Sequence, residues 1–189
     1  MDALGLLQKT VAETDKLVQN LDDDDLATPT RCTEWTVRDL INHIAGGATM
    51  FAISAEQGSV PDDLIGQLMG GDNLGDDYRA AWSTASQRAL KAFEEPGVMD
   101  KMVTLPFGEM PAGVALNIAV FDVATHATDI AAATGQQVGD TELLESALAI
   151  GQQMISPEMR TGIFNAAQPC PDDAPVADRL AAFAGRQVS

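Results

Sequence analysis

Apolar residues recur every three or four positions along most of the chain, which is the spacing of an amphipathic α-helix. The first such stripe consists of Leu4, Leu7, Val11 and Val18. Later stripes, bounded by capping residues, extend the prediction to five helices, at residues 2–20, 36–54, 76–93, 113–134 and 140–155. A shorter helix is expected around residues 179–183.

The ends of three of these helices carry local signals. Thr36 and Asp39 have the spacing of a capping box, in which each side chain bonds to the backbone N–H of the other residue. Gly135 follows the last apolar position of its helix, and Asp140 stands where an N-cap residue is expected. These residues predict helix boundaries, which apolar spacing alone leaves open.

The segments between the stripes predict the connections. Residues 56–75 are rich in Gly, Asp and Pro and indicate a long surface loop or lid. Residues 101–113 indicate a small β-hairpin or an extended crossover. The chain from about residue 156 is Pro-rich and predicted to be mostly irregular. We find no internal repeat, so residues 1–189 are interpreted as one domain, an antiparallel four-helix bundle with a long crossover. The loop and the tail are expected to flank the mouth of its functional site and to set the choice of substrate.

Composition narrows the class of protein. A net charge of -17 and a pI near 4.1 argue against nucleic acid or an anionic membrane surface as a partner. No stretch resembles a secretion signal or the run of about 20 apolar residues of a membrane span, so a cytoplasmic protein is expected. Cys32 and Cys170 show no metal or redox spacing and are interpreted as free thiols.

Three residues form a candidate metal site. Asp122 and His126 lie four positions apart, so they project side by side from one helix, a spacing that suits two ligands of one ion. His43 lies on the corresponding flank of helix 36–54, with Gly47 one turn further on leaving space between the helices. Two imidazoles and a carboxylate suit Zn, Ni, Mn or Fe. The alternative from the residues alone is that these are unrelated polar groups on solvated helix faces.

Other polar residues lie one turn from these candidates. Asp129 is placed to accept the second ring N–H of His126, with a solvated carboxylate as the alternative. Asp39 precedes His43 by one turn, although its capping role already accounts for it. Arg38 is expected to pair with an acid of the long loop or the tail, the alternative being a contact to a substrate carboxylate.

Two residues before helix 36–54 also have more than one interpretation. Trp35 is interpreted as a packing residue in preference to a platform for substrate. Cys32 lies close to a helix N-terminus, where a thiol pKa can be lowered. It is nevertheless interpreted as a buried thiol in preference to a nucleophile or a fourth metal ligand. No catalytic acid or base is predicted from the sequence.

Longer motifs carry a resemblance to a known family. The segment TRCTEWTVRDLINHIAGG resembles the sequence around the first metal ligand of the DinB-like superfamily, and more closely the N-terminal, metal-binding domain of mycothiol-dependent maleylpyruvate isomerases. LPFGEMPAG followed by FDVATHATDIAAATGQ is similar to the fourth-helix region of that family. The tail, RTGIFNAAQPCPDDAPVADRLAAFAGR, resembles that of a short metal-binding subgroup.

The resemblance implies an all-α, DinB/YfiT-like four-helix bundle with a long crossover, a small hairpin and an extra C-terminal helix. The three metal ligands of the family fall on His43, Asp122 and His126. Asp122 departs from the isomerase pattern, which has a glutamate there, and the C-terminal domain of the isomerase is expected to be absent.

The function implied is that of a divalent-metal protein, with zinc as the expected ion and nickel as an alternative. A low-molecular-weight thiol such as mycothiol is the implied co-substrate, in S-transfer or isomerisation of a small electrophile. The alternatives are a non-catalytic metal- or ligand-binding module and a metal-dependent hydrolase. The implied partners are the thiol and a small-molecule substrate, and a monomer or a homodimer is expected.

Overall fold

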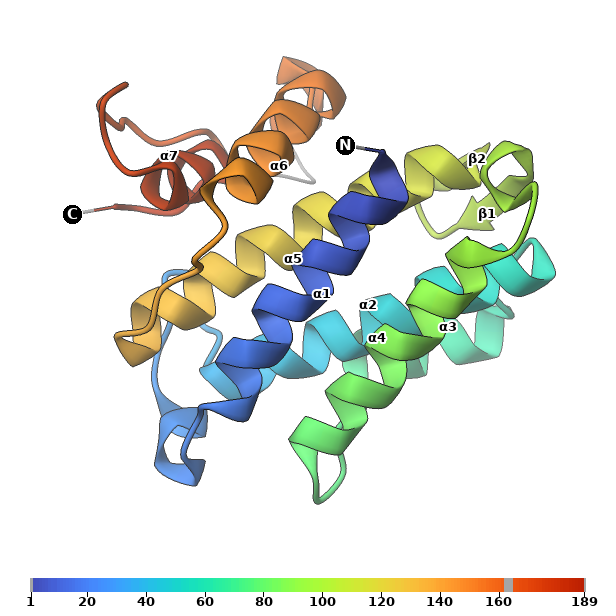
Figure 1. Cartoon of the computed structure of the whole chain (residues 1–189), viewed down its shortest axis with the longest axis horizontal. Coiled ribbons are helices and arrows are strands. Elements are labelled where there is room, and N and C mark those ends of the chain that lie inside the picture. The colour runs from blue at the N-terminus through green and yellow to red at the C-terminus, as the bar shows by residue number, and fades with distance from the viewer. Residues whose placement is uncertain (1, 162–164, 189) are drawn as a thin grey trace.

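The computed structural model describes residues 2–161 and 165–188 and is built mainly of helices (Figure 1). The α-helices are α1 (Ala3–Gln19), α2 (Val37–Gln57), α3 (Asp62–Gly70), α4 (Tyr78–Glu94), α5 (Ala112–Thr134), α6 (Thr141–Met154) and α7 (Val176–Phe183). Two antiparallel strands, β1 (Met102–Leu105) and β2 (Gly108–Pro111), form a hairpin, and short 3-10 helices occur at Asp23–Ala27, Val98–Asp100 and Pro157–Thr161. The predicted all-α fold and the small hairpin are confirmed.

Four long helices form the bundle. Helix α1 packs against α4 and α5, and α2 packs against the same two helices, so that the four make a closed ring (Figure 1). Helix α3 lies on α2, while α6 and α7 lie on α5 and on each other. The hairpin lies beside the first turns of α5 and also touches α2. Helix α5 thereby contacts elements from both ends of the chain.

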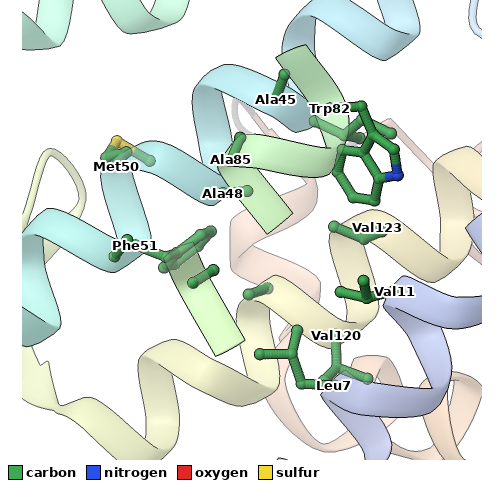
Figure 2. Packing of buried hydrophobic residues seen from close by; sticks show 14 of the residues in the cluster. Leu7, Val11, Ala45, Ala48, Met50, Phe51, Trp82, Ala85, Val120 and Val123 are labelled. Carbon is green, nitrogen blue, oxygen red and sulfur yellow. The ribbon is translucent and has the colours of Figure 1, made fainter. Parts of the chain in front are cut away.

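The core between these helices is aliphatic, with few large rings. Figure 2 shows side chains from four helices meeting there, among them Leu7, Val11, Phe51, Trp82, Val120 and Val123. Trp82 and Phe93 of α4 are almost fully buried. Each large apolar side chain buried in this way stabilises the fold by about 1.5–3 kcal/mol. This packing fixes α2 against α5, the two helices that carry the candidate ligands.

The predicted helix boundaries agree with the structure where a cap marks them. The Asp39 carboxylate accepts a hydrogen bond from the Thr36 backbone N–H at 2.8 Å, and the Thr36 side chain accepts one from the Asp39 N–H. Gly135 ends α5 in the left-handed region at φ 68°, a conformation that glycine adopts without a Cβ clash. Asp140 caps α6 by accepting a hydrogen bond from the backbone N–H of Leu143.

The prediction of an irregular loop over residues 56–75 is wrong in its central part, which forms α3. Its Gly and Asp residues masked a short apolar stripe, of which Leu68 is buried. Helix α3 approaches α2 at Gly46, where an added Cβ would lie 2.2 Å from the Leu68 carbonyl oxygen. The predicted pairing of Arg38 with an acid of this segment is confirmed, since its guanidinium lies 3.3 Å from the Asp72 carboxylate.

Helix α5 corrects the expectation that no segment has the length and apolarity of a membrane span. Within residues 2–161 and 165–188 it is the one helix that passes this test, over Ala112–Thr134. Of its most apolar window, 78% is buried inside the structure. Its apolar composition is therefore accounted for by its position among α1, α2, α6 and α7.

Candidate metal centre

The three predicted ligands meet between α2 and α5. Oδ1 of Asp122 lies 3.4 Å from Nε2 of His43 and 3.6 Å from Nε2 of His126. One donor atom from each residue lies within 4.8 Å of the other two. Zinc bonds of about 2.0–2.2 Å at tetrahedral angles separate neighbouring ligand atoms by about 3.3–3.6 Å. The donor set therefore fits one divalent ion in both chemistry and spacing.

Local geometry explains this convergence. Asp122 and His126 are one turn apart on α5, and the two imidazole rings meet edge to face with their centroids 4.9 Å apart. Side-chain exposure differs among the three, at 22% for His43, 30% for Asp122 and 7% for His126. The centre is consequently closed on the His126 side and open to solvent past the other two residues.

The two half-buried members, His43 and Asp122, are coupled by charge. Burial on its own would lower the pKa of His43, but the charge and the hydrogen bond of the Asp122 carboxylate outweigh it and raise that pKa above its ordinary 6.5. Burial would raise the pKa of Asp122, yet His43, His126 and Arg186 together hold it at about 2. Asp122 is thus an ionised carboxylate next to imidazoles, the state in which a carboxylate binds a metal ion.

Gly47 of α2 lies beside the Asp122 carboxylate. A Cβ at Gly47 would lie 4.0 Å from Oδ2 of Asp122, the nearest heavy atom to it. Gly47 and Asp122 also line a small cavity of about 10 Å³ whose other walls are largely apolar core residues. That volume is about the size of one water molecule. Asp122 therefore borders the apolar core as well as the proposed centre.

An aromatic wall, not predicted from the sequence, covers the histidines. The Trp35 ring lies 4.9 Å from the His43 ring and stacks on the His126 ring at 5.8 Å, centroid to centroid. The turn before α2 holds it there: Glu34 adopts the left-handed conformation at φ 72°, and Thr30 donates hydrogen bonds to the Trp35 carbonyl oxygen. Trp35 packs against the core as predicted, and its ring also forms part of the site.

A buried ion pair supports the closed side. Asp129 is fully buried, and its Oδ2 accepts hydrogen bonds from Nε and Nη2 of Arg186 at 3.1 and 3.0 Å. The same oxygen lies 3.3 Å from Nδ1 of His126, the contact predicted for Asp129. When Nε2 of His126 binds an ion, Nδ1 carries the ring hydrogen and points it at the side of the Asp129 carboxylate. Nη2 of Arg186, 3.5 Å from Nδ1, is then a neighbouring donor.

Arg186 is the other residue that the sequence did not assign to the site. It lies in the tail after α7 and reaches a helix that ended more than 50 residues earlier in the chain. The tail was expected to flank the mouth of the site, whereas Arg186 contacts the closed side, beside His126 and Asp129. The composition offered one signal for such a role of Arg186. A buried carboxylate requires a basic partner, and the chain has only 11 lysines and arginines from which that partner can come.

The remaining candidates lie around this centre. The hydrogen bonds of Asp39 go to Thr36 at the helix start, so Asp39 serves as a cap. Cys32 and Cys170 are free thiols, as predicted. Cys32 is half-buried with its Sγ 3.8 Å from Nη2 of Arg186, and burial raises the pKa of its thiol despite the nearby guanidinium. Such a thiol is not activated as a nucleophile by its protein surroundings.

Comparison with solved structures identifies proteins that share this fold. The crystal structure of a mycothiol-dependent maleylpyruvate isomerase matches with a TM-score of 0.65 and 18% sequence identity, over 79% of this chain and 66% of the isomerase chain. A mutant of that isomerase matches equally well, with a TM-score of 0.66. The chain thus spans just under two thirds of these isomerase chains, and at this identity the likeness establishes the fold.

Sequence comparison gives the family. The family model of the mycothiol maleylpyruvate isomerase N-terminal domain matches residues 7–131, and the chain belongs to this family. Relatives over the full length are the uncharacterized proteins Rv0738 and MT0763 of two strains of Mycobacterium tuberculosis (ATCC 25618 / H37Rv and CDC 1551 / Oshkosh). Each is 37% identical over 195 residues, covering 100% of both chains. The predicted resemblance is confirmed, and all three candidate ligands lie inside the matched segment.

Proposed function

We propose that the chain is a cytoplasmic metalloprotein that binds one divalent ion through His43, Asp122 and His126. The observation that carries the proposal is the convergence of their donor atoms at 3.4 and 3.6 Å, the spacing of ligands around one small cation. Zinc is the proposed ion, with nickel as the alternative, since imidazole and carboxylate suit both.

The proposed activity is S-transfer or isomerisation of a small electrophile with a low-molecular-weight thiol such as mycothiol. It is supported by membership of the family named for the mycothiol isomerase. A bound divalent ion supplies the chemistry this needs, because it lowers the pKa of a thiol and polarises a carbonyl oxygen. The substrate and the thiol would enter past His43 and Asp122, which form the exposed side of the centre.

The side chains of the protein have distinct roles in this proposal. Asp129 lies beside Nδ1 of His126 and so favours the orientation in which Nε2 faces Asp122. Trp35 covers both imidazole rings and excludes water from that face. A monomer or a homodimer is proposed, with no nucleic acid or membrane partner.

A non-catalytic metal- or ligand-binding module is the second candidate. It is favoured by the observation that the charged groups nearest the centre, Asp129 and Arg186, are bonded to each other and to the structure around them. They therefore support the ligands, whereas a general acid or base must exchange a proton with substrate.

Metal content tests the ligand set. Purified wild-type protein is expected to hold about one ion per chain. His43→Ala, Asp122→Ala and His126→Ala are each expected to lose most of it, because losing even a residue that only positions a ligand typically weakens binding by about 10–100-fold. Asp39→Ala is the matched control, since it removes a carboxylate from α2 outside the centre. Wild-type content in any two of the three ligand variants would refute the proposal.

Calorimetry with mycothiol, bacillithiol and glutathione then tests the activity. Binding of one thiol to the metal-loaded protein but not to the metal-free protein, followed by turnover with model electrophiles, supports the enzyme. Strong thermal stabilisation by the metal with no thiol affinity supports the module.

A further inference from the structure

A second group of metal-ligating side chains lies directly behind the proposed centre. Donor atoms of Cys32, His126 and Asp129 all lie within 4.8 Å of one another. His126 belongs to both groups: its Nε2 faces Asp122, and its Nδ1 faces Asp129. A thiolate, an imidazole nitrogen and a carboxylate form a donor set that binds zinc or cobalt.

In the structure a cationic side chain occupies this position. Nη2 of Arg186 lies 3.0 Å from Oδ2 of Asp129, 3.5 Å from Nδ1 of His126 and 3.8 Å from Sγ of Cys32. One nitrogen of the guanidinium is therefore in contact with all three members of the group. Arginine stays protonated at every pH at which a protein is folded, so the positive charge at this point is permanent.

We propose that Cys32, His126 and Asp129 form a second cation site, which the protein fills with its own Arg186 and which binds a divalent metal once the guanidinium is removed. Arg186 thereby limits the centre to one ion. This inference rests on the proposed function only in assigning the first ion to Nε2 of His126.

The surroundings allow such an exchange. Metal bonds of about 2.0–2.3 Å require the three donors to move inward from their contacts with Arg186. His126 and Asp129 are fixed on α5, but Cys32 lies in the turn before α2 and is half-buried. Asp129 has a further oxygen to offer, because its Oδ1 is buried without a hydrogen-bond partner in the described part of the chain.

The exchange balances in protons and charge. With the first ion on Nε2 of His126, uptake of a second ion breaks the S–H bond of Cys32 and the Nδ1–H bond of His126, and both protons pass to the buffer; with Nε2 free, the ring hydrogen moves to Nε2 and only the thiol proton is released. The thiolate, the Asp129 carboxylate and the ion then replace the ion pair between Asp129 and Arg186. While Arg186 is present, its charge opposes a second cation at about 3 Å and holds the carboxylate.

Cobalt titration of the metal-free protein tests the inference, because a cobalt–thiolate bond gives a charge-transfer absorption in the near ultraviolet. Wild type is expected to bind cobalt without this absorption. Arg186→Ser is expected to show it and to bind one more ion per chain, and the double variant Arg186→Ser/Cys32→Ser is expected to lose it. Arg186→Lys keeps a cation in place and is expected to behave as wild type.

The control is Arg31→Ser. It breaks a different ion pair with the tail, in which Nη1 of Arg31 lies 2.8 Å from Oδ1 of Asp178, and it is expected to show no thiolate absorption. Thiolate absorption in wild type, or its absence in an Arg186→Ser protein that melts cooperatively, overturns the inference. Should Arg186→Ser fail to fold, Arg186→Gln decides by the same criteria. A wild type that binds no cobalt, beside an Arg186→Ser protein with Cys32-dependent absorption, refutes the proposed function and leaves this inference standing.

Discussion

The ion pair between Asp129 and Arg186 is expected to be the most costly polar interaction in the molecule to break. Asp129 has a side-chain exposure of 0% and Arg186 of 15%, so the carboxylate has no access to water that could replace the guanidinium. Removing one partner of a buried ion pair destabilises a fold by about 3–5 kcal/mol. In a chain of 189 residues this corresponds to a decrease in Tm of about 6–20 °C.

The two single substitutions are expected to differ. Arg186→Ala leaves a fully buried carboxylate that keeps its contact with Nδ1 of His126 but has no remaining cationic partner at Oδ2, while Oδ1 already lacks a hydrogen-bond partner in the described residues. Asp129→Ala leaves a guanidinium that still donates to the Ala184 carbonyl oxygen and has partial access to water. Arg186→Ala is therefore expected to cost more.

A double-mutant cycle measures the coupling. Urea unfolding of metal-free wild type, both single variants and the double variant is expected to give a coupling of about 1–3 kcal/mol, since residues in one ion pair are not additive. The pair between Arg31 and Asp178 also fixes the tail but is 29% and 30% exposed. It serves as the control and is expected to contribute no more than about 1 kcal/mol. Additive effects within about 0.5 kcal/mol at Asp129 and Arg186 would refute the reasoning.

Two further predictions concern the surroundings of the ligands. The Cβ of Gly46→Ala would lie 2.2 Å from the Leu68 carbonyl oxygen, so this variant is expected to lose about 1–3 kcal/mol of unfolding free energy in urea. The Cβ of Gly47→Ala would lie 4.0 Å from the nearest atom, so this variant is expected to unfold like wild type and to keep its metal. Equal losses of stability in the two variants would contradict the geometry. In metal-free protein the raised pKa of His43 means that its pairing with Asp122 stabilises the fold fully below about pH 6.5 and is lost as the pH rises through the folded pKa. The lowered pKa of Asp122, about 2, means that its share is present above 3.8 and is lost as the pH falls toward 2. The difference in urea midpoint between wild type and His43→Ala is thus expected to be largest between these limits, and a difference that grows above neutral pH would contradict it.

Local chemistry made much of the fold predictable. The capping box of Thr36 and Asp39 and the glycine cap at Gly135 depend only on residues close in sequence, so these helix boundaries can be predicted from the sequence alone. The shared flank positions of His43 and Asp122 likewise follow from helix periodicity. Helix α3 was missed because its Gly and Asp residues favour turns and it has a single fully packed apolar residue, so packing on α2 decides its structure.

The contacts of Arg186 and Trp35 were not predictable in the same way. Arg186 lies 57 residues beyond Asp129, and no periodic pattern links a tail residue to a helix so distant. Trp35 reaches the histidines because the turn before α2 includes a left-handed Glu34, a conformation that non-glycine residues seldom adopt. Both placements depend on tertiary structure, and both concern the surroundings of the ligands rather than the ligands themselves.

The placement of one ligand on α2 and two on α5 makes the proposed ion a topological cross-link. His43 and Asp122 are 79 residues apart in sequence, and the segment between them includes α3, α4 and the hairpin. In the simplest chain model, a permanent link that closes a loop of this length lowers the entropy of the unfolded chain by the equivalent of about 4–5 kcal/mol. The ion would then hold α2 and α5 together as a disulfide does in an oxidising compartment, but reversibly, and a chelator would be enough to open the loop.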